Sequence, residues 1–138
     1  MPQPFHLAIP VTNLNDAVAF YGELLGCEQG RSDTQWIDWN FFGHQLVTHC
    51  VNAMPTPPEY NNVDSHAVPV PHFGVVLTMP QWEALAETVK QANIDFIIAP
   101  YIRFKGEPGE QATMFFTDPF GNALEFKAFA SLSQLFAT

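Results

Sequence analysis

The chain has 138 residues, of which 47% are hydrophobic, and this is enough apolar material to fill the core of one domain. Five Lys and Arg residues accompany fourteen Asp and Glu residues, and the formal net charge of −9 argues against nucleic acid or an anionic membrane as a partner. The N-terminus lacks a basic region followed by an apolar run, and no stretch approaches the roughly 20 apolar residues that span a bilayer. We therefore expect a soluble, cytoplasmic protein.

The first half of the chain predicts a strand, a helix and three further strands. Residues 5–9 alternate in polarity, which predicts a short strand that carries His6. Apolar residues then recur at helical spacing, between a cap at Asn13 or Asn15 and a glycine at the helix end, Gly26. The further strands are expected over residues 27–31, 35–41 and 45–51.

The second half repeats this order. A strand is predicted over residues 72–77 and begins with His72. Pro80 lies where a helix begins and Asn93 where it ends. Three more strands are expected over residues 95–99, 112–117 and 123–129.

The order β-α-β-β-β therefore occurs twice, as an internal repeat. Each half has an apolar sheet face that it cannot cover alone, so we predict a single α+β domain. Five of the twelve prolines fall in the segment between the halves, which favours an extended, stiff crossover over a packed element. The predicted parts are module 1 at 5–51, the proline-rich connector at 52–71 and module 2 at 72–129.

A candidate metal site emerges when the two halves are aligned. His6 and His72 each lie in the first strand of a half, and the turn glycines align Glu125 with Val47. A strand glutamate commonly points to solvent, and that interpretation remains open for Glu125. Two imidazoles and one carboxylate on inward sheet faces instead form a set that leaves open positions on a divalent metal, as in non-heme Fe(II) oxygenases. Manganese or zinc can use the same set.

Several motifs resemble those of the vicinal oxygen chelate superfamily, which includes glyoxalase I, extradiol dioxygenases, fosfomycin thiol transferases and bleomycin-resistance proteins. They are the sequences FHLAIPV from Phe5, AFYGELLGC from Ala19, PHFGV from Pro71 and TDPFGNALEF from Thr117. The resemblance implies a glyoxalase-like fold whose curved sheet surrounds a metal cleft. It also implies His6, His72 and Glu125 as metal ligands, a small-molecule substrate, and a homodimer.

Departures from the family pattern narrow the expected chemistry. Val47 occupies the place of the fourth ligand of glyoxalase I and cannot coordinate a metal, so a four-ligand site is disfavoured unless His49 substitutes. Phe115 occupies the place where three-ligand members commonly have a tyrosine, and Tyr101 is the candidate replacement. His49 resembles the acid/base histidine of extradiol enzymes and suits proton transfer near neutral pH. A core imidazole bonded to the backbone is the alternative for His49.

The loop over residues 101–111 holds two of the five basic residues. Arg103 is predicted to hold an anionic or enolate oxygen of the substrate there. The alternative is a hairpin in which Arg103 and Lys105 pair with Glu107 and Glu110. Phe115 is expected in the core and as a lining residue of a cavity that accepts an aromatic ring.

The leading functional hypothesis is an extradiol-type dioxygenase that acts on a catechol-like, oxygen-chelating substrate. Fe(II) bound by His6, His72 and Glu125 would serve as Lewis acid and template, with His49 as the acid/base and Tyr101, Arg103 and Phe115 binding substrate. A second hypothesis keeps the ligands but uses Mn or Zn for lyase, isomerase or thiol-transfer chemistry. The third is a metal-free protein that sequesters small molecules and has no catalytic role.

Overall fold

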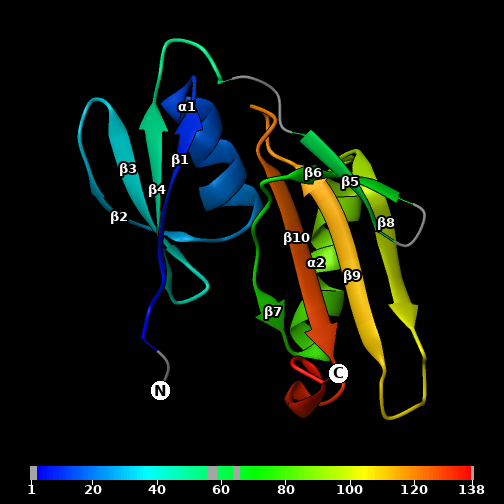
Figure 1. Cartoon of the computed structure of the whole chain (residues 1–138). Coiled ribbons are helices and arrows are strands. Elements are labelled where there is room, and N and C mark those ends of the chain that lie inside the picture. Colours follow the sequence, from blue (N-terminus) through cyan, green and yellow to red (C-terminus); the bar gives the residue numbers. More distant parts are fainter. Residues whose placement is uncertain (1–2, 56–58, 64–65, 138) are drawn as a thin grey trace. The chain divides into compact units, whose positions relative to one another are not determined.

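The computed structural model describes residues 3–55, 59–63 and 66–137, and it divides into two compact units (Figure 1). The first unit comprises Met1–Pro57 and Asp118–Asn122, and the second comprises Pro58–Thr117 and Ala123–Thr138. Each unit contains one β-α-β-β-β repeat. Among the described residues, no helix combines the length and the apolar character needed to cross a bilayer.

The first unit is a four-stranded sheet with one helical segment on a face. Its strand order is β1-β4-β3-β2, in which β1 is parallel to β4 and the other pairs are antiparallel. The elements are β1 (His6–Val11), α1 (Leu14–Ala17), the π-helical η1 (Val18–Leu24), β2 (Glu28–Ser32), β3 (Trp36–Phe41) and β4 (His44–Cys50).

Alternation along the strands of the first unit separates a helix-facing side from the opposite side, which carries His6. Trp39 and Tyr21 are buried on the helix side, with ring centroids 6.3 Å apart. His6 lies on the opposite face and is exposed, as period-two alternation predicts. Asn13 caps α1 through its side chain and Gly26 has φ +74°, so both predicted helix ends are confirmed.

The second unit has the same topology, with strand order β7-β10-β9-β8. Its helix α2 packs against β10, where Trp82 donates a hydrogen bond to the Phe126 carbonyl at 3.0 Å. Thr78 and Gln81 form a capping box at the start of α2. The elements are β7 (Val76–Leu77), α2 (Met79–Gln91), β8 (Phe96–Arg103), β9 (Gln111–Thr117), β10 (Ala123–Phe129) and the 3-10 helix η2 (Leu132–Gln134).

Strand register confirms the alignment of the two repeats. Leu7 of β1 pairs with Leu46 of β4, and Phe73 makes the corresponding parallel bridge to Leu124 of β10. Counting one residue further along each last strand aligns Val47 with Glu125, as the turn glycines predicted. In both halves, the histidine lies one residue before the position just compared: His6 before Leu7, and His72 before Phe73.

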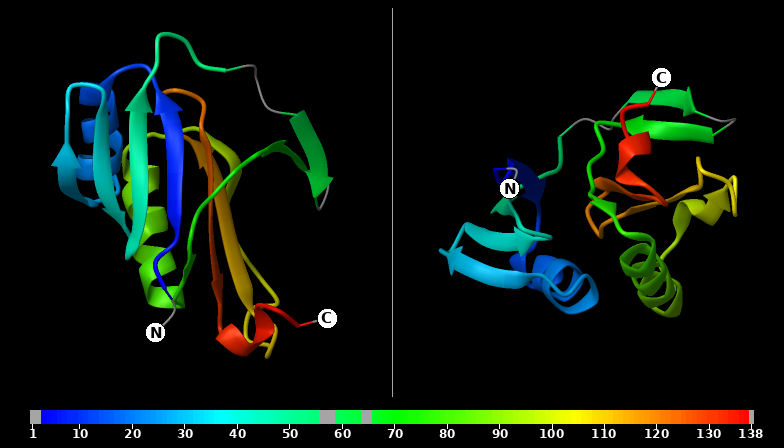
Figure 2. Two further views of the ribbon diagram at one scale, coloured as in Figure 1. Left: turned by 60° about the vertical axis from the view of Figure 1, so that its left-hand side comes forward. Right: turned by 90° about the horizontal axis from the view of Figure 1, so that it is seen from below.

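The connector differs from its prediction. It contains a β-hairpin of β5 (Glu59–Val63) and β6 (His66–Val70), which lies across the sheet face opposite α2 (Figure 2). Val68 joins a buried cluster with Ile98, Phe115 and Ala123. The expectation of an unpacked crossover was therefore wrong, because Val68 of β6 is buried against Ile98, Phe115 and Ala123 of the sheet. Pro57 and Pro58 lie outside the described residues.

The Asp-Pro-Phe-Gly-Asn turn of the first unit is organised by hydrogen bonds to one buried side chain, Asp118. Asp118 accepts hydrogen bonds from the Tyr21 hydroxyl at 2.6 Å and the Asn122 side chain at 2.8 Å. Its other oxygen accepts from the backbone N–H groups of Phe120 and Asn122. The side-chain amide of Asn122 also donates to the Pro10 carbonyl. This motif is therefore structural, and the strands on both sides of it belong to the second unit.

Candidate metal centre

Close contact between two chain segments positions the histidine of the second unit. The Glu125 N–H donates to the Phe73 carbonyl at 2.8 Å, which holds the segment after His72 against β10. A Cβ placed on Gly74 would lie 1.6 Å from the Glu125 carbonyl oxygen, so only glycine permits this approach. His72 and Glu125 are thus brought together by the backbone.

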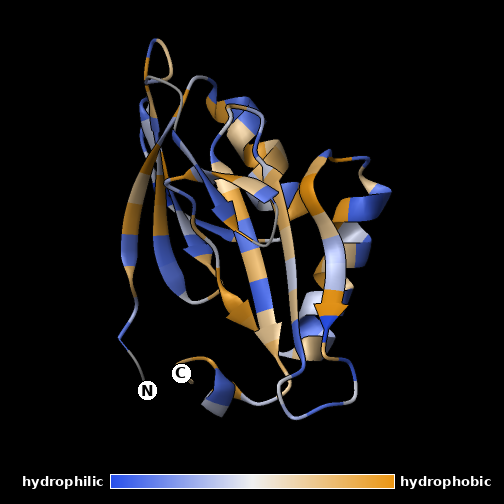
Figure 3. Cartoon of the chain, turned by 45° about the vertical axis from the view of Figure 1, so that its right-hand side comes forward, coloured by the Kyte–Doolittle hydropathy of each residue, from blue (hydrophilic) through white to orange (hydrophobic). Residues whose placement is uncertain are grey.

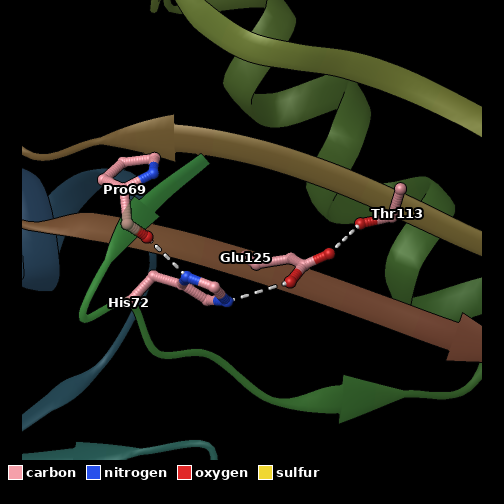
Figure 4. Close-up of polar contacts among 4 residues, drawn as sticks. All are labelled: Pro69, His72, Thr113 and Glu125. Atoms are coloured by element: carbon pink, nitrogen blue, oxygen red, sulfur yellow. Dashed lines mark hydrogen bonds and ion pairs between the residues drawn. The ribbon is translucent and has the colours of Figure 1, made fainter. Parts of the chain in front are cut away.

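His72 and Glu125 form a partly buried pair on the face opposite α2 (Figure 4). The Nε2 of His72 lies 3.4 Å from Oε1 of Glu125, and their side chains are 30% and 17% exposed. The Nδ1 of His72 lies 2.8 Å from the Pro69 carbonyl oxygen. A carbonyl oxygen only accepts, so Nδ1 carries the proton and Nε2 is the atom that faces the carboxylate.

The surroundings of this pair are polar on one side and aromatic on the other. Thr113 donates its hydroxyl to Oε2 of Glu125 at 2.7 Å. Phe115, the direct cross-strand partner of Glu125, contacts the His72 ring with centroids 4.7 Å apart. Figure 3 shows hydrophilic and hydrophobic residues interspersed along the strands. The sequence analysis missed Thr113, although its place two residues before Phe115 puts it on the Glu125 face.

The donor set of the pair fits a divalent cation. Neighbouring ligand atoms on one divalent cation, with bonds of about 2.0–2.2 Å, are about 3.0 Å apart in octahedral and about 3.4 Å apart in tetrahedral geometry. The separation of His72 Nε2 and Glu125 Oε1 is 3.4 Å. A neutral imidazole lone pair and a carboxylate that face each other repel, and a cation between them removes this repulsion. The carbonyl that holds Nδ1 is the kind of partner that orients metal-bound histidines.

The predicted residues of the first unit share one face of its sheet. His6 is exposed and its Nδ1 lies 2.7 Å from the side-chain oxygen of Gln45, its register partner. Val47 is 6% exposed and His49 is exposed two residues further along the same face. The alternative of a core imidazole for His49 was therefore wrong.

The remaining predicted residues lie on β8 and β9. Tyr101 is 37% exposed and pairs with Thr113, and Arg103 pairs with Gln111, so register places both on the sheet face of Glu125. Residues 101–111 form the end of β8, a turn and the start of β9, which is a hairpin, and the ion pairs that the alternative expected for Arg103 and Lys105 stay a prediction. The Arg103 guanidinium lies 5.1 Å from the centroid of the Phe104 ring. Tyr101 also borders an open hollow of about 500 Å³ between α2 and β8.

The structure thus brings together His72, Glu125 and Phe115, with Thr113 added to them. Within the described part of either unit, no three His, Cys, Asp or Glu side chains are grouped to hold a metal ion. His6 and His49 belong to the first unit, and their roles as third ligand and acid/base stay predictions.

Comparison with known proteins adds family evidence to this geometry. Residues 3–126 match the model of the Glyoxalase/Bleomycin resistance protein/Dioxygenase superfamily. A glyoxalase/bleomycin resistance protein/dioxygenase from Alicyclobacillus acidocaldarius is 32% identical, with a TM-score of 0.73 and coverage of 97% of this chain and 96% of that chain. No curated protein sequence matched the chain.

Two further solved structures share the fold at lower identity. The fosfomycin resistance protein FosX from Listeria monocytogenes is 16% identical, with a TM-score of 0.70 and coverage of 97% and 98% of the two chains. A glyoxalase/dioxygenase from Nostoc punctiforme is 14% identical, with a TM-score of 0.70 and coverage of 94% and 92%.

Proposed function

Because the chain belongs to the glyoxalase/bleomycin resistance protein/dioxygenase superfamily, we propose that it is a metal-dependent enzyme that acts on a small, oxygen-chelating substrate. The observation that carries this proposal is the His72–Glu125 pair, whose facing atoms are 3.4 Å apart. His72 and Glu125 would hold the cation, and His6 is the proposed third ligand. When bound, the metal supplies Lewis acidity and a template for the substrate oxygens.

The more specific proposal is ring cleavage of a catechol-like substrate with Fe(II) as the metal. The ring of Phe115 lies against His72, and its buried neighbours Val68, Ile98 and Ala123 are apolar. These side chains are buried, so they support the His72 ring from behind, and a planar aromatic group beside the metal ligands stays part of the proposal. Val47 is buried and cannot coordinate, which supports a three-ligand site over a four-ligand site.

Three side chains are proposed to act on the substrate. Tyr101 and Arg103 share the sheet face of Glu125, where a phenol and a guanidinium can hydrogen-bond substrate oxygens. His49 is exposed on its own sheet, which leaves its imidazole accessible for proton transfer. A His49→Gln variant that keeps full turnover would remove it from the mechanism.

Oxygen uptake tests the specific reaction. The protein is loaded with Fe(II) without oxygen and then mixed with oxygenated buffer that contains one of a panel of catechols. We expect substrate-dependent oxygen consumption and a coloured ring-opened product, and we expect neither from a His72→Ala variant. Oxygen consumption that is equal in both proteins would reflect free iron and would contradict the proposal.

A second candidate is thiol transfer, lyase or isomerase chemistry with Mn or Zn. The match to the superfamily model, which covers glyoxalases as well as dioxygenases, supports this candidate. Activity with a thiol acceptor or a hemithioacetal, together with silence on every catechol, would favour it. Wild-type protein that binds no metal would instead support a small-molecule-binding protein without catalysis. The expected homodimer stays a prediction that light scattering can test.

A further inference from the structure

Thr113 gives the two oxygens of Glu125 different partners. Oε2 accepts the Thr113 hydroxyl at 2.7 Å, whereas Oε1 faces His72 Nε2 at 3.4 Å. An ionised carboxylate only accepts hydrogen bonds, so the hydroxyl proton points to Oε2, takes up one of its lone pairs and holds the carboxylate with Oε1 toward His72. Figure 4 shows the two contacts on opposite sides of the carboxylate.

Thr113 is held where it can maintain this contact. It lies in the middle of β9, while Glu125 lies in β10, and antiparallel pairing joins the two strands along seven residue pairs. Phe115 is the direct partner of Glu125, so Thr113 is its diagonal neighbour, within reach of a long side chain. The branched threonine side chain has restricted χ1 rotation, which lowers the entropy cost of the hydrogen bond.

We propose that Thr113 is a positioning residue that makes Glu125 bind the metal through Oε1 alone. A carboxylate that binds through both oxygens occupies two coordination positions, whereas one oxygen occupies a single position. The hydrogen bond therefore keeps one additional position open for an oxygen of the substrate. This inference depends on the proposed function, since it requires that His72 and Glu125 bind a divalent cation.

The test uses Mn(II), whose bound water molecules speed the relaxation of solvent protons. Wild type is compared with Thr113→Val, which keeps the side-chain shape, and with Thr113→Ser, which keeps the hydroxyl. Without the hydroxyl, Glu125 turns to bind through both oxygens and displaces one water. In a six-coordinate site with three protein ligand atoms, the relaxation enhancement per bound Mn(II) should then fall by roughly a third. Thr113→Ser should match wild type.

One control and one further test variant separate this effect from a general disturbance of the sheet. Thr117→Val makes the same substitution on the same strand, next to Ala123 instead of the carboxylate, and should leave the relaxation unchanged. Thr113→Ala is a second variant without a hydroxyl, so that a folding defect in one variant does not decide the result. A Thr113→Val protein that is folded and gives wild-type relaxation would overturn this inference alone. Wild-type protein that binds no Mn(II) would overturn the proposed function as well.

Discussion

The two halves of this molecule hold equivalent histidines in different ways. His72 is fixed through Nδ1 by the Pro69 carbonyl, a backbone atom, and its Nε2 faces Glu125. His6 is fixed through Nδ1 by the side chain of Gln45, and its side chain is exposed. In both halves, an oxygen acceptor at Nδ1 leaves Nε2 as the atom available to a cation.

The neighbouring positions differ more strongly. Gly74 permits the segment before β7 to approach Glu125 closely, whereas Ala8 occupies the equivalent place in β1 and pairs with Val47. One repeat thus has a carboxylate beside a glycine, and the other has two apolar side chains. A duplicated fold can therefore keep its register in both halves and retain the full polar arrangement in one of them.

The largest expected effect comes from making the second half resemble the first. Glu125→Val should raise the Kd for Mn(II) by at least about 100-fold. Loss of a residue that only hydrogen-bonds a metal ligand costs about 10–100-fold in affinity, and loss of the ligand itself should cost more. Isothermal titration calorimetry measures this change. Glu83→Gln, which changes an exposed carboxylate on α2, is the matched control and should bind like wild type. Equal affinity in Glu125→Val and wild type would remove Glu125 from the metal centre.

Exchanging the glycine and alanine tests the difference in strand approach. Gly74→Ala should lower the free energy of unfolding by about 3 kcal/mol or more, because its Cβ would meet the Glu125 backbone and its segment would have to move away from β10. Ala8→Gly, at the equivalent exposed position, should cost only about 0.5–1 kcal/mol through chain entropy. Urea denaturation gives both values, and equal costs at the two positions would contradict this account of the close approach.

Tyr21→Phe tests the buried turn of the first unit. The variant should lose about 1.5–3 kcal/mol of stability at neutral pH, since a hydrogen bond to a buried carboxylate is removed. Tyr60→Phe, at a tyrosine that is 60% exposed, is the control and should change stability little. Thermal or urea unfolding of the three proteins provides the comparison.

The same variant has a predicted pH dependence. Burial raises the pKa of Asp118 above its usual value, although hydrogen bonds from Tyr21 and Asn122 lower it. The contribution of this group to stability is therefore full below its unfolded pKa and is lost as pH rises through the folded pKa. Without the Tyr21 hydroxyl that pKa should rise further, so Tyr21→Phe should cost less in acid than at neutral pH. If Tyr21→Phe costs the same stability in acid as at neutral pH, the Tyr21 hydroxyl does not act by stabilising ionised Asp118.

The smallest expected effect concerns Gln45, whose side-chain oxygen contacts Nδ1 of His6 as the Pro69 carbonyl contacts Nδ1 of His72. Gln45→Leu should weaken metal binding by about tenfold at most, since exposed His6 can exchange this partner for water. In a His6→Ala background, the same substitution should have no effect. An equal loss in both backgrounds would show that Gln45 does not act through His6.

Much of the secondary structure was predictable because local patterns determine it. The strand at 123–129 has the predicted limits, and the left-handed Asn93 and the capped start of α2 agree with the predicted helix. The connector hairpin was missed because its prolines favoured an extended segment, whereas Val68 of β6 is buried against the sheet. Composition describes a segment by itself and omits the sheet on which the segment packs.

The sequence by itself determined the repeat, its register and the candidates His72 and Glu125, because alternation and turn chemistry act over a few residues. Only the tertiary structure decided what holds them: the Pro69 carbonyl on Nδ1, the Thr113 hydroxyl on Oε2 and the close approach at Gly74. It also assigned Asp118 to a structural role beside Tyr21, 97 positions away in the chain. These contacts depend on which atoms of distant segments meet at hydrogen-bonding distance, and local pattern carries no information about that distance.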